Sequence, residues 1–339
     1  MPQNIQKIVY LFGAGATHSE LTNLDENLIE EKYGLLMRHV SARVIEKARH
    51  KKPYLKGLEM VSSTKGSLNI ELLISLIESS RVEDWEQKSR ILKGLVKEDI
   101  NRVLTTQRKS RFYLHKALVE LHEHRKVKAK EKLIGLISLN YDDVLDRAYE
   151  KYYGPPNYCF SLKDNPPISG KVPLLKLHGS FNWTGIRVNG RIRTMEIIPL
   201  GANKNYIHTP YNFIWNRAME VVTECDILRV IGCSLSQNDL HLVDLLFKAH
   251  LEKGKPFIIE IIGSDTTGQR IRENYGFFPE IKTLTEIGSP SAGYANQVPL
   301  VAEAKPENVF ATWLRYKANS LLLKNEIKAA TYLKHFTTI

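Results

Sequence analysis

Five short apolar runs stand out along the chain, and each ends in glycine or a small polar residue. They span Lys7–Phe12, Leu133–Leu139, Pro173–Leu177, Ile227–Ile231 and Phe257–Ile262. Continuous apolar runs of this length, rich in Leu and β-branched residues, are typical of parallel strands that are buried on both faces. Helical patterns follow most of them. The pattern therefore predicts repeated strand–helix units and an α/β fold with an open parallel sheet.

A long helical region separates the first two predicted strands. Apolar residues recur there at helical spacing, as at Leu28, Ile29, Tyr33, Leu36 and Val40, then Ile70, Leu73, Ile74 and Ile77, and finally Phe112, Leu118 and Leu121. Pro53 and the polar stretch 62–66 supply breaks. We predict a helical insertion over residues 25–130, so that residues 1–24 and 131–283 together form the sheet domain.

The C-terminal part of the chain contributes no predicted strand. Residues 288–306 lack apolar periodicity, whereas Val309, Trp313, Tyr316, Leu321 and Leu322 indicate a helix. We therefore assign 284–339 to an irregular linker and a C-terminal helix. Neither this region nor the insertion carries a recognisable piece of a ligand pocket, so both are expected to be contact surfaces for other chains.

Composition narrows the function classes. The 339 residues are 43% hydrophobic and 25% charged, which excludes wholesale disorder and favours about two domains. None of the three cysteines forms a Cys-x-x-Cys pair, so we expect neither a zinc module nor a disulfide framework. No apolar stretch is long enough to span a bilayer and no signal peptide is recognisable, so a cytoplasmic protein is expected. The net charge of +11 favours anionic partners.

Two of the predicted strands run directly into small-residue turns. The first ends in Gly13-Ala14-Gly15-Ala16-Thr17 and the fourth in Gly232-Cys233-Ser234-Leu235-Ser236. Glycines at such turns let the backbone approach a diphosphate, whose charge the next helix N-terminus favours, as in Rossmann-like folds. The alternative is a tight turn without a ligand, because the third glycine of a dinucleotide fingerprint and its acidic ribose ligand are missing. Cys233 has no evident base beside it and is interpreted as a small turn residue.

The other two strand ends carry polar side chains. Asn140 and Asp142 follow the second strand, and His178 follows the third. An amide can hold a sugar hydroxyl or a water, and a histidine titrates near neutrality and can serve as a general base. Helix capping is an alternative for Asn140 and Asp142, and the better one for Asp143, whereas His178 has a structural alternative. No carboxylate or cysteine partners at ligand spacing indicate a metal site. Together the four loops predict one nucleotide crevice at the sheet edge.

The order and the residues of these four loops resemble those of the sirtuin-like, or silent information regulator, family. GAGAT at 13–17 is similar to its Gly-Ala-Gly-x-Ser/Thr loop, LNYDD at 139–143 to its Gln-Asn-x-Asp motif in the bacterial Asn-Tyr-Asp form, KLHGS at 176–180 to its catalytic His-Gly, and GCSL at 232–235 to its Gly-Thr/Ser-Ser-Leu loop. The resemblance implies that Asn140 and His178 are catalytic. It also implies that Gly13, Ala14, Gly15, Thr17, Asp142, Gly232 and Ser234 bind NAD.

Two departures redirect the expected activity. Protein-deacylating sirtuins carry two cysteine pairs in a zinc module and a Pro-Asp-Phe-Arg segment after the glycine loop, and this chain has neither. What remains resembles the sirtuin-like effectors of bacterial antiviral defence. That resemblance implies an NAD hydrolase in which NAD is the substrate, with a homo-oligomer, a HerA-type ATPase or a short Argonaute as partner. The nicotinamide group is cationic in NAD and leaves as a neutral molecule without a general acid, which agrees with the single histidine in the four loops.

Two rival functions stay open at this stage. Basic clusters at Arg38, Arg43, Lys47, Arg49, Lys51, Lys52 and Lys56, and at Lys126, Lys128, Lys130 and Lys132, would suit an inert subunit that binds nucleotide or nucleic acid. Such runs are more often solvated helix faces. A nicotinamide-dependent dehydrogenase is weakened by the missing acidic ribose ligand.

Overall fold

The computed structural model describes residues 5–24, 27–50, 69–106, 112–161, 171–188, 191–195, 197–198, 206, 208–236, 239–254, 257–278, 280–283, 309–321 and 332. Of the predicted basic residues, Lys51, Lys52 and Lys56 lie outside these ranges, as do the irregular stretch 288–306 and Leu322.

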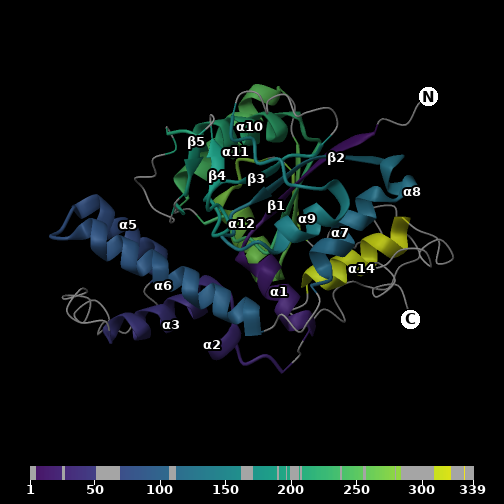
Figure 1. The fold of residues 1–339 in the computed structure, drawn as a ribbon. Helices are drawn as coiled ribbons and strands as arrows, with labels where there is room; N and C mark the ends of the chain where they lie inside the picture. Colours follow the sequence, from purple (N-terminus) through teal and green to yellow (C-terminus); the bar gives the residue numbers. More distant parts are fainter. Residues whose placement is uncertain are drawn as a thin grey trace.

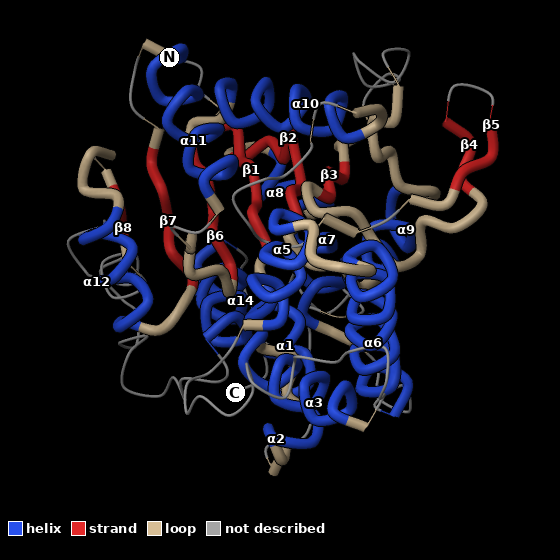
Figure 2. Tube along the Cα trace, turned by 90° about the vertical axis from the view of Figure 1, so that its left-hand side faces the viewer, coloured by secondary structure: helices blue, strands red, loops and turns tan. Residues whose placement is uncertain are grey.

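A six-stranded parallel sheet forms the centre of the molecule (Figure 2). Its strands are β1 (Gln6–Phe12), β2 (Glu131–Ser138), β3 (Leu174–Lys176), β6 (Ile227–Ile231), β7 (Ile258–Ile262) and β8 (Ile281–Lys282), in the spatial order β3-β2-β1-β6-β7-β8. The chain thus starts in the middle, adds two strands on one side and three on the other, which is the Rossmann order. The predicted fold class is confirmed. The short strand β8 and the hairpin of β4 (Ile186–Val188) and β5 (Arg191–Arg193) were not predicted.

Two helical layers cover the sheet, and the residues of β1 alternate between them. Val9 and Leu11 pack with α10 (Tyr211–Glu224), α11 (Leu240–Lys253) and α12 (Asp265–Asn274). Ile8, Tyr10 and Phe12 pack with α7 (Leu114–Glu123), α9 (Val144–Tyr153) and α14 (Val309–Leu321), beside α1 (Ala14–Leu24) and α8 (Arg125–Lys128). The predicted C-terminal helix is therefore α14, and it covers the sheet. None of the helices in the described ranges is long and apolar enough to cross a membrane.

A third apolar cluster joins four further helices to the sheet domain. Its core comes mainly from α3 (Met37–Arg49), α5 (Ile70–Ser80) and α6 (Trp85–Thr106), with Tyr33 of α2 (Glu30–Tyr33) packed against it, and it also includes Leu21 of α1 and Val144 of α9. Helices α2, α3, α5 and α6 project from the sheet domain in Figure 1. We call these four helices the cap. The apolar pattern at 28–40 is not one helix: Tyr33 lies in α2 and Val40 in α3, and the chain between them is extended at Gly34 and Leu36. The helix predicted around Leu118 is α7, which packs on the sheet with β1.

A buried ionic network ties α14 to the sheet. The Arg229 guanidinium on β6 donates to both carboxylate oxygens of Glu131 at 2.7 and 2.9 Å and to Glu260 at 2.7 Å. Lys317 of α14 lies 2.6 Å from Glu131, and the Tyr10 hydroxyl accepts from Arg229 at 3.0 Å. Arg229 and Glu131 are 1% and 5% exposed. Every charge here has an opposite partner, as buried charges require.

Candidate functional site

The loops after β1 and β6 meet where the strand order reverses. The amide of Gly13 donates to the carbonyl of Ile231 at 3.0 Å, and that of Gly15 to the carbonyl of Gly232 at 2.8 Å. A Cβ on Gly15 would lie 2.8 Å from that carbonyl oxygen, and Gly232 has a φ of +58°. Neither position therefore accepts a side chain without displacing the other loop. Ligands of open α/β sheets bind at such a reversal point.

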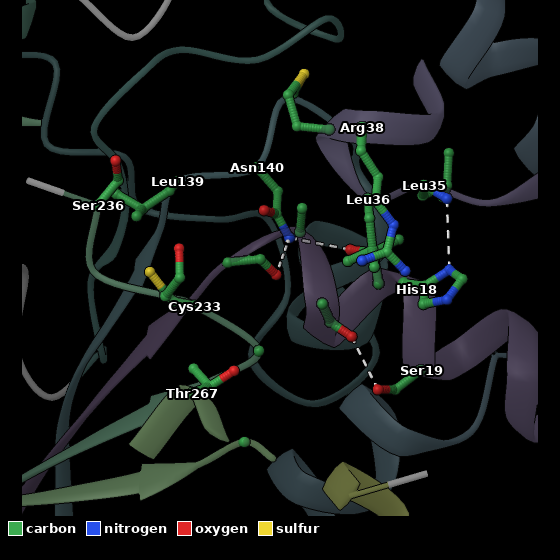
Figure 3. Close-up of a pocket in the computed structure, with 18 of the residues that line it drawn as sticks. His18, Ser19, Leu35, Leu36, Arg38, Leu139, Asn140, Cys233, Ser236 and Thr267 are labelled. Carbon is green, nitrogen blue, oxygen red and sulfur yellow. Dashed lines mark hydrogen bonds between the residues drawn. The ribbon is translucent and has the colours of Figure 1, made fainter. Parts of the chain in front are cut away.

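A pocket of about 550 Å³ opens at this point (Figure 3). It is lined by all nine residues that the sequence predicted for the site, namely Gly13, Ala14, Gly15, Thr17, Asn140, Asp142, His178, Gly232 and Ser234. The structure thus brings the four strand-end loops together around one cavity, with the N-terminus of α1 among its walls.

Asn140 is fixed against the glycine loop by its side-chain nitrogen. Nδ2 donates to the carbonyl of Gly13 at 2.9 Å and to Oγ1 of Thr17 at 3.0 Å. In Figure 3 the amide nitrogen faces these groups and the amide oxygen is turned away from them. Both donor hydrogens are thus used inside the protein, and Oδ1 is the atom that can accept a hydrogen bond from a ligand or a water. Asn140 does not act as a helix cap here.

Asp142 has a structural role as well as a place in the pocket wall. Its Oδ1 accepts from the amide of Val144 at 3.0 Å and its Oδ2 from the Thr17 hydroxyl at 3.0 Å. Burial raises the pKa of the Asp142 carboxyl, and the nearby ammonium of Lys176 opposes this. Lys176 itself is buried between the Asp142 carbonyl and the carboxylate of Asp146. The loop that carries Asn140 and Asp142 is therefore anchored by Thr17 of α1 on one side and by Lys176 of β3 on the other.

His178 lies in the turn that follows β3, with 1% of its side chain exposed. Its carbonyl accepts from the amide of Ile198 at 2.9 Å, and Gly179 after it has a φ of +82°. Its Nε2 lies 2.9 Å from Oδ2 of Asp239, which is as deeply buried. Asp239 also lines the pocket. A histidine beside a carboxylate in a cavity wall is suited to proton transfer.

The cap and the C-terminal helix supply part of the pocket, contrary to our expectation that neither would. The cap region contributes Glu30, Leu35, Leu36, Met37, Arg38, Glu71 and Ile100, and α14 contributes Val309 and Phe310. The expectation was wrong because the folded insertion turns back over the strand ends, a non-local contact that no local pattern encodes. Glu71 is 4% exposed, and its carboxylate accepts from the Tyr141 hydroxyl at 2.6 Å.

A charged cluster at the cap side of the pocket includes Arg38, whose side chain extends from α3 toward His18 in Figure 3. Glu30 lies 3.3 Å from Arg38, 2.9 Å from His39 and 3.4 Å from His18. Burial lowers the pKa of His39, although the charge of Glu30 opposes this. The pocket therefore combines a helix N-terminus, an exposed guanidinium and acceptor groups, which suits an anionic ligand with polar hydroxyls.

Comparison with known proteins agrees with this geometry. A family model described as a SIR2-like domain matches residues 135–257, which include Asn140, His178, Gly232 and Asp239. This part of the chain is thus similar to a SIR2-like domain. The match begins inside β2, so the glycine loop after β1 and the cap lie outside the matched residues.

Solved structures similar to the chain include a Sir2 homolog–NAD complex, at 16% identity over 93% of this chain and 91% of that one, with a TM-score of 0.39. A structure titled for the mechanism and regulation of Sir2 enzymes is 13% identical over 93% of both chains, with a TM-score of 0.36. A Sir2–p53 peptide–NAD⁺ complex is 12% identical over 80% of this chain and 93% of that one, with a TM-score of 0.34. No curated protein matches the chain.

Arg38, Glu71 and Asp239 are among the pocket-lining residues that sequence analysis did not assign to the site. Arg38 and Glu71 belong to the cap, far in sequence from the four loops. Asp239 comes shortly after the Gly232 loop and immediately before α11, so its sequence position could have indicated a site residue. An acidic residue at the start of a helix is, however, equally typical of an N-cap. Among the residues that the structure describes, no group of three His, Cys, Asp or Glu side chains is placed to hold a metal.

Proposed function

We propose that this chain binds NAD in the pocket and hydrolyses its nicotinamide–ribose bond to nicotinamide and ADP-ribose. The observation that carries the proposal is that Asn140 and His178 line the same cavity as two glycine turns at the sheet reversal point. NAD would be a substrate and not a recycled cofactor.

Different walls of the pocket would contact the two halves of NAD. The amides at the start of α1 and the turns at Gly13 and Gly232 would hold the diphosphate, with Arg38 as a cation on the cap side. Thr17, Asp142 and Ser234 would contribute to the ribose and diphosphate contacts. Asn140 and His178 would then face the nicotinamide ribose.

Hydrolysis of the nicotinamide–ribose bond would need few catalytic side chains. Oδ1 of Asn140 would accept a hydrogen bond from the attacking water or a ribose hydroxyl, because its Nδ2 is already used. His178 would take the proton of the water as its oxygen bonds to the ribose C1′. The C1′–N bond breaks with its electron pair passing to nicotinamide, which leaves neutral and needs no general acid.

Incubation of the purified protein with NAD, followed by chromatography of the nucleotides, tests the proposal. Asn140→Ala and His178→Ala should each lower nicotinamide release by at least about 10²-fold, the usual contribution of a positioned acid–base group. His50→Ala is the matched control, since His50 is 79% exposed on its side chain and lies outside the pocket. Wild-type release from a folded His178→Ala protein would remove its catalytic assignment.

Asn140→Ala also removes two hydrogen bonds to the glycine loop, which costs about 0.5–1.5 kcal/mol each. Its thermal unfolding must therefore be measured beside its activity. A variant that stays folded at the assay temperature but releases no nicotinamide separates the catalytic role from the structural one.

We further propose that the chain is the effector of a bacterial anti-phage system that depletes NAD, as the family resemblance implies. A constitutive NAD hydrolase would starve its own cell, so the activity would be gated by a homo-oligomer, a HerA-type ATPase or a short Argonaute. Light scattering, with NAD assays across protein concentration and with each candidate partner, tests this. Full activity of a monomer at nanomolar concentration, indifferent to partner and nucleic acid, would contradict it.

The alternative is an inert subunit that binds nucleotide or nucleic acid. Its support is weakened by the ion pairs of the basic segments: Arg43 lies 2.7 Å from Asp99, and Lys128 lies 2.7 Å from Glu123. Salt-dependent DNA binding without any nicotinamide release would favour this alternative. Acetyl-peptides supplied with NAD should stay intact under either function.

A further inference from the structure

Asp239 occupies the N-cap position of α11, yet its side chain makes no capping hydrogen bond. Its Oδ2 instead lies 2.9 Å from Nε2 of His178, and the two side chains are 2% and 1% exposed. The Asp239 amide donates to the carbonyl of Ser236 at 2.9 Å, which fixes the backbone next to the Gly232 loop. The backbone next to the Gly232 loop thus places Asp239 against His178, which belongs to the loop after β3.

A carboxylate at this distance influences which ring nitrogen of a buried, neutral imidazole is protonated and how readily the ring accepts a second proton. The negative charge of Asp239 favours a proton on the nearby Nε2, which leaves the lone pair of the neutral ring on Nδ1. The negative charge also stabilises the imidazolium that forms when Nδ1 accepts a proton. The N-terminus of α11 in turn favours the negative charge on Asp239. The arrangement therefore supplies an oriented base from two buried residues.

The charge of Asp239 also acts on four weakly acidic side chains. They are Tyr141 of the loop after β2, Cys233 of the loop after β6, Tyr275 at the end of α12, and Tyr206. Burial, with the charge of Asp239 adding to it, raises the pKa of the Cys233 thiol to about 12 and those of Tyr206 and Tyr275 above their usual range. For Tyr141, burial and then Glu71 are the main causes of its raised pKa. These four groups stay protonated near neutral pH, so they do not compete with His178 for its role.

We propose that Asp239 is a positioning residue, which holds His178 in the Nε2–H tautomer and makes it a stronger base for the attack of water on NAD. The catalytic part of this inference rests on the proposed hydrolysis, whereas the control of the histidine by Asp239 does not.

Histidine-selective ¹⁵N labelling of the full chain tests that control without any turnover. The His178 signals are assigned by their loss in His178→Gln, and the two-bond proton–nitrogen correlations report the tautomer. We expect the Nε2–H form in the wild type. In Asp239→Asn the pKa of His178 should fall by about 1–3, because a charge of opposite sign next to the ring is lost. An Nδ1–H tautomer in the wild type, or a His178 that titrates identically in Asp239→Asn, would overturn the proposal.

Kinetics supplies the second readout. Asp239→Asn should lower kcat by about 10²–10⁴-fold with KM in the same order of magnitude, and should move the acidic limb of the pH profile to lower pH. Asp239→Glu should retain more activity than Asp239→Asn, since it keeps the charge. Asp244→Asn is the matched control: Asp244 lies on the same helix with 53% of its side chain exposed. It should behave as the wild type.

The outcomes separate the two proposals. A wild-type protein that releases no nicotinamide under any condition would overturn the proposed function, and the NMR titration would still decide whether Asp239 sets the state of His178. Active Asp239→Asn protein with an unchanged pH profile would overturn the positioning role alone. If Asp239→Asn fails to fold, the wild-type tautomer and the Asp239→Glu titration decide.

Discussion

The Glu131→Gln substitution tests whether the buried ionic network stabilises the sheet and α14 together. Glu131 pairs with both Arg229 and Lys317, and all three side chains are at most 10% exposed. Glutamine keeps the shape of the side chain but removes its charge. Arg229 would retain Glu260, whereas Lys317 would lose its 2.6 Å partner.

The expected cost follows from the burial. Removing one partner of a buried ion pair typically costs about 3–5 kcal/mol, because the other charge stays desolvated. The whole free energy of unfolding of a protein is about 5–15 kcal/mol. At about 2–4 °C per kcal/mol, the melting temperature should fall by about 6–20 °C.

Urea unfolding at pH 7 measures this cost. Glu224→Gln, which breaks the exposed pair with Lys7, is the control and should change stability by no more than about 0.5 kcal/mol. Adding Lys317→Met to Glu131→Gln removes the stranded ammonium and should recover about 0.5–3 kcal/mol. A Glu131→Gln protein within about 1 kcal/mol of the wild type would refute the reasoning.

The pH dependence of the difference has a defined sign. The charges of Arg229 and Lys317 hold the pKa of Glu131 well below its usual range, although burial opposes them. A depressed folded-state pKa gives stability that is present above the unfolded value and lost as the pH falls through the folded one. The gap between wild type and Glu131→Gln should therefore be constant from pH 8 to pH 5 and shrink only below about 4.3, where the unfolded glutamate is protonated.

Two further predictions concern the Gly232 loop. Gly232→Ala should lose at least about 1–3 kcal/mol of stability and bind NAD at least about tenfold more weakly, because its Cβ would lie 2.1 Å from the Ala16 amide nitrogen at a φ of +58°. Gly185→Ala, also at positive φ but with open space around it, is the control in melting and calorimetric NAD titration. The thiols of Cys225 and Cys233, whose pKa values burial raises to about 12, should resist iodoacetamide at pH 8 in intact-mass measurements. Rapid labelling of either in the folded protein would contradict this burial.

Local patterns were sufficient for most of the sheet. The predicted run at Ile227–Ile231 coincides with β6, because a parallel strand buried on both faces is mostly apolar, here with the single exception of Arg229. The strand β8 consists of Ile281 and Lys282 alone, too short to make a run. The residues 28–40 show the opposite failure: the apolar spacing continues through Gly34, where the backbone leaves the helix.

The candidate site could likewise be predicted from the sequence only where local patterns mark it. Asn140 and His178 were predicted because they come directly after apolar runs, and parallel strands place their carboxyl ends at one edge. Glu71 reaches that edge only through the tertiary placement of α5, which no spacing in the sequence encodes. Asp239 was next to a predicted loop, but its sequence position suits a helix cap equally well, and only its 2.9 Å contact with His178 shows where the side chain points.

The cap is joined to the pocket by a short chain of contacts. Glu71 of α5 accepts from the Tyr141 hydroxyl at 2.6 Å, and the Tyr141 carbonyl accepts from the Ser180 hydroxyl at 3.1 Å, two residues after His178. The pair of Arg43 and Asp99 fastens α3 to α6 within the cap. Displacement of α5 would therefore move Tyr141, which lies beside Asn140 in sequence. The cap can therefore line the pocket and still present its outer face to another chain, and these contacts are where coupling between the two would be sought by mutation.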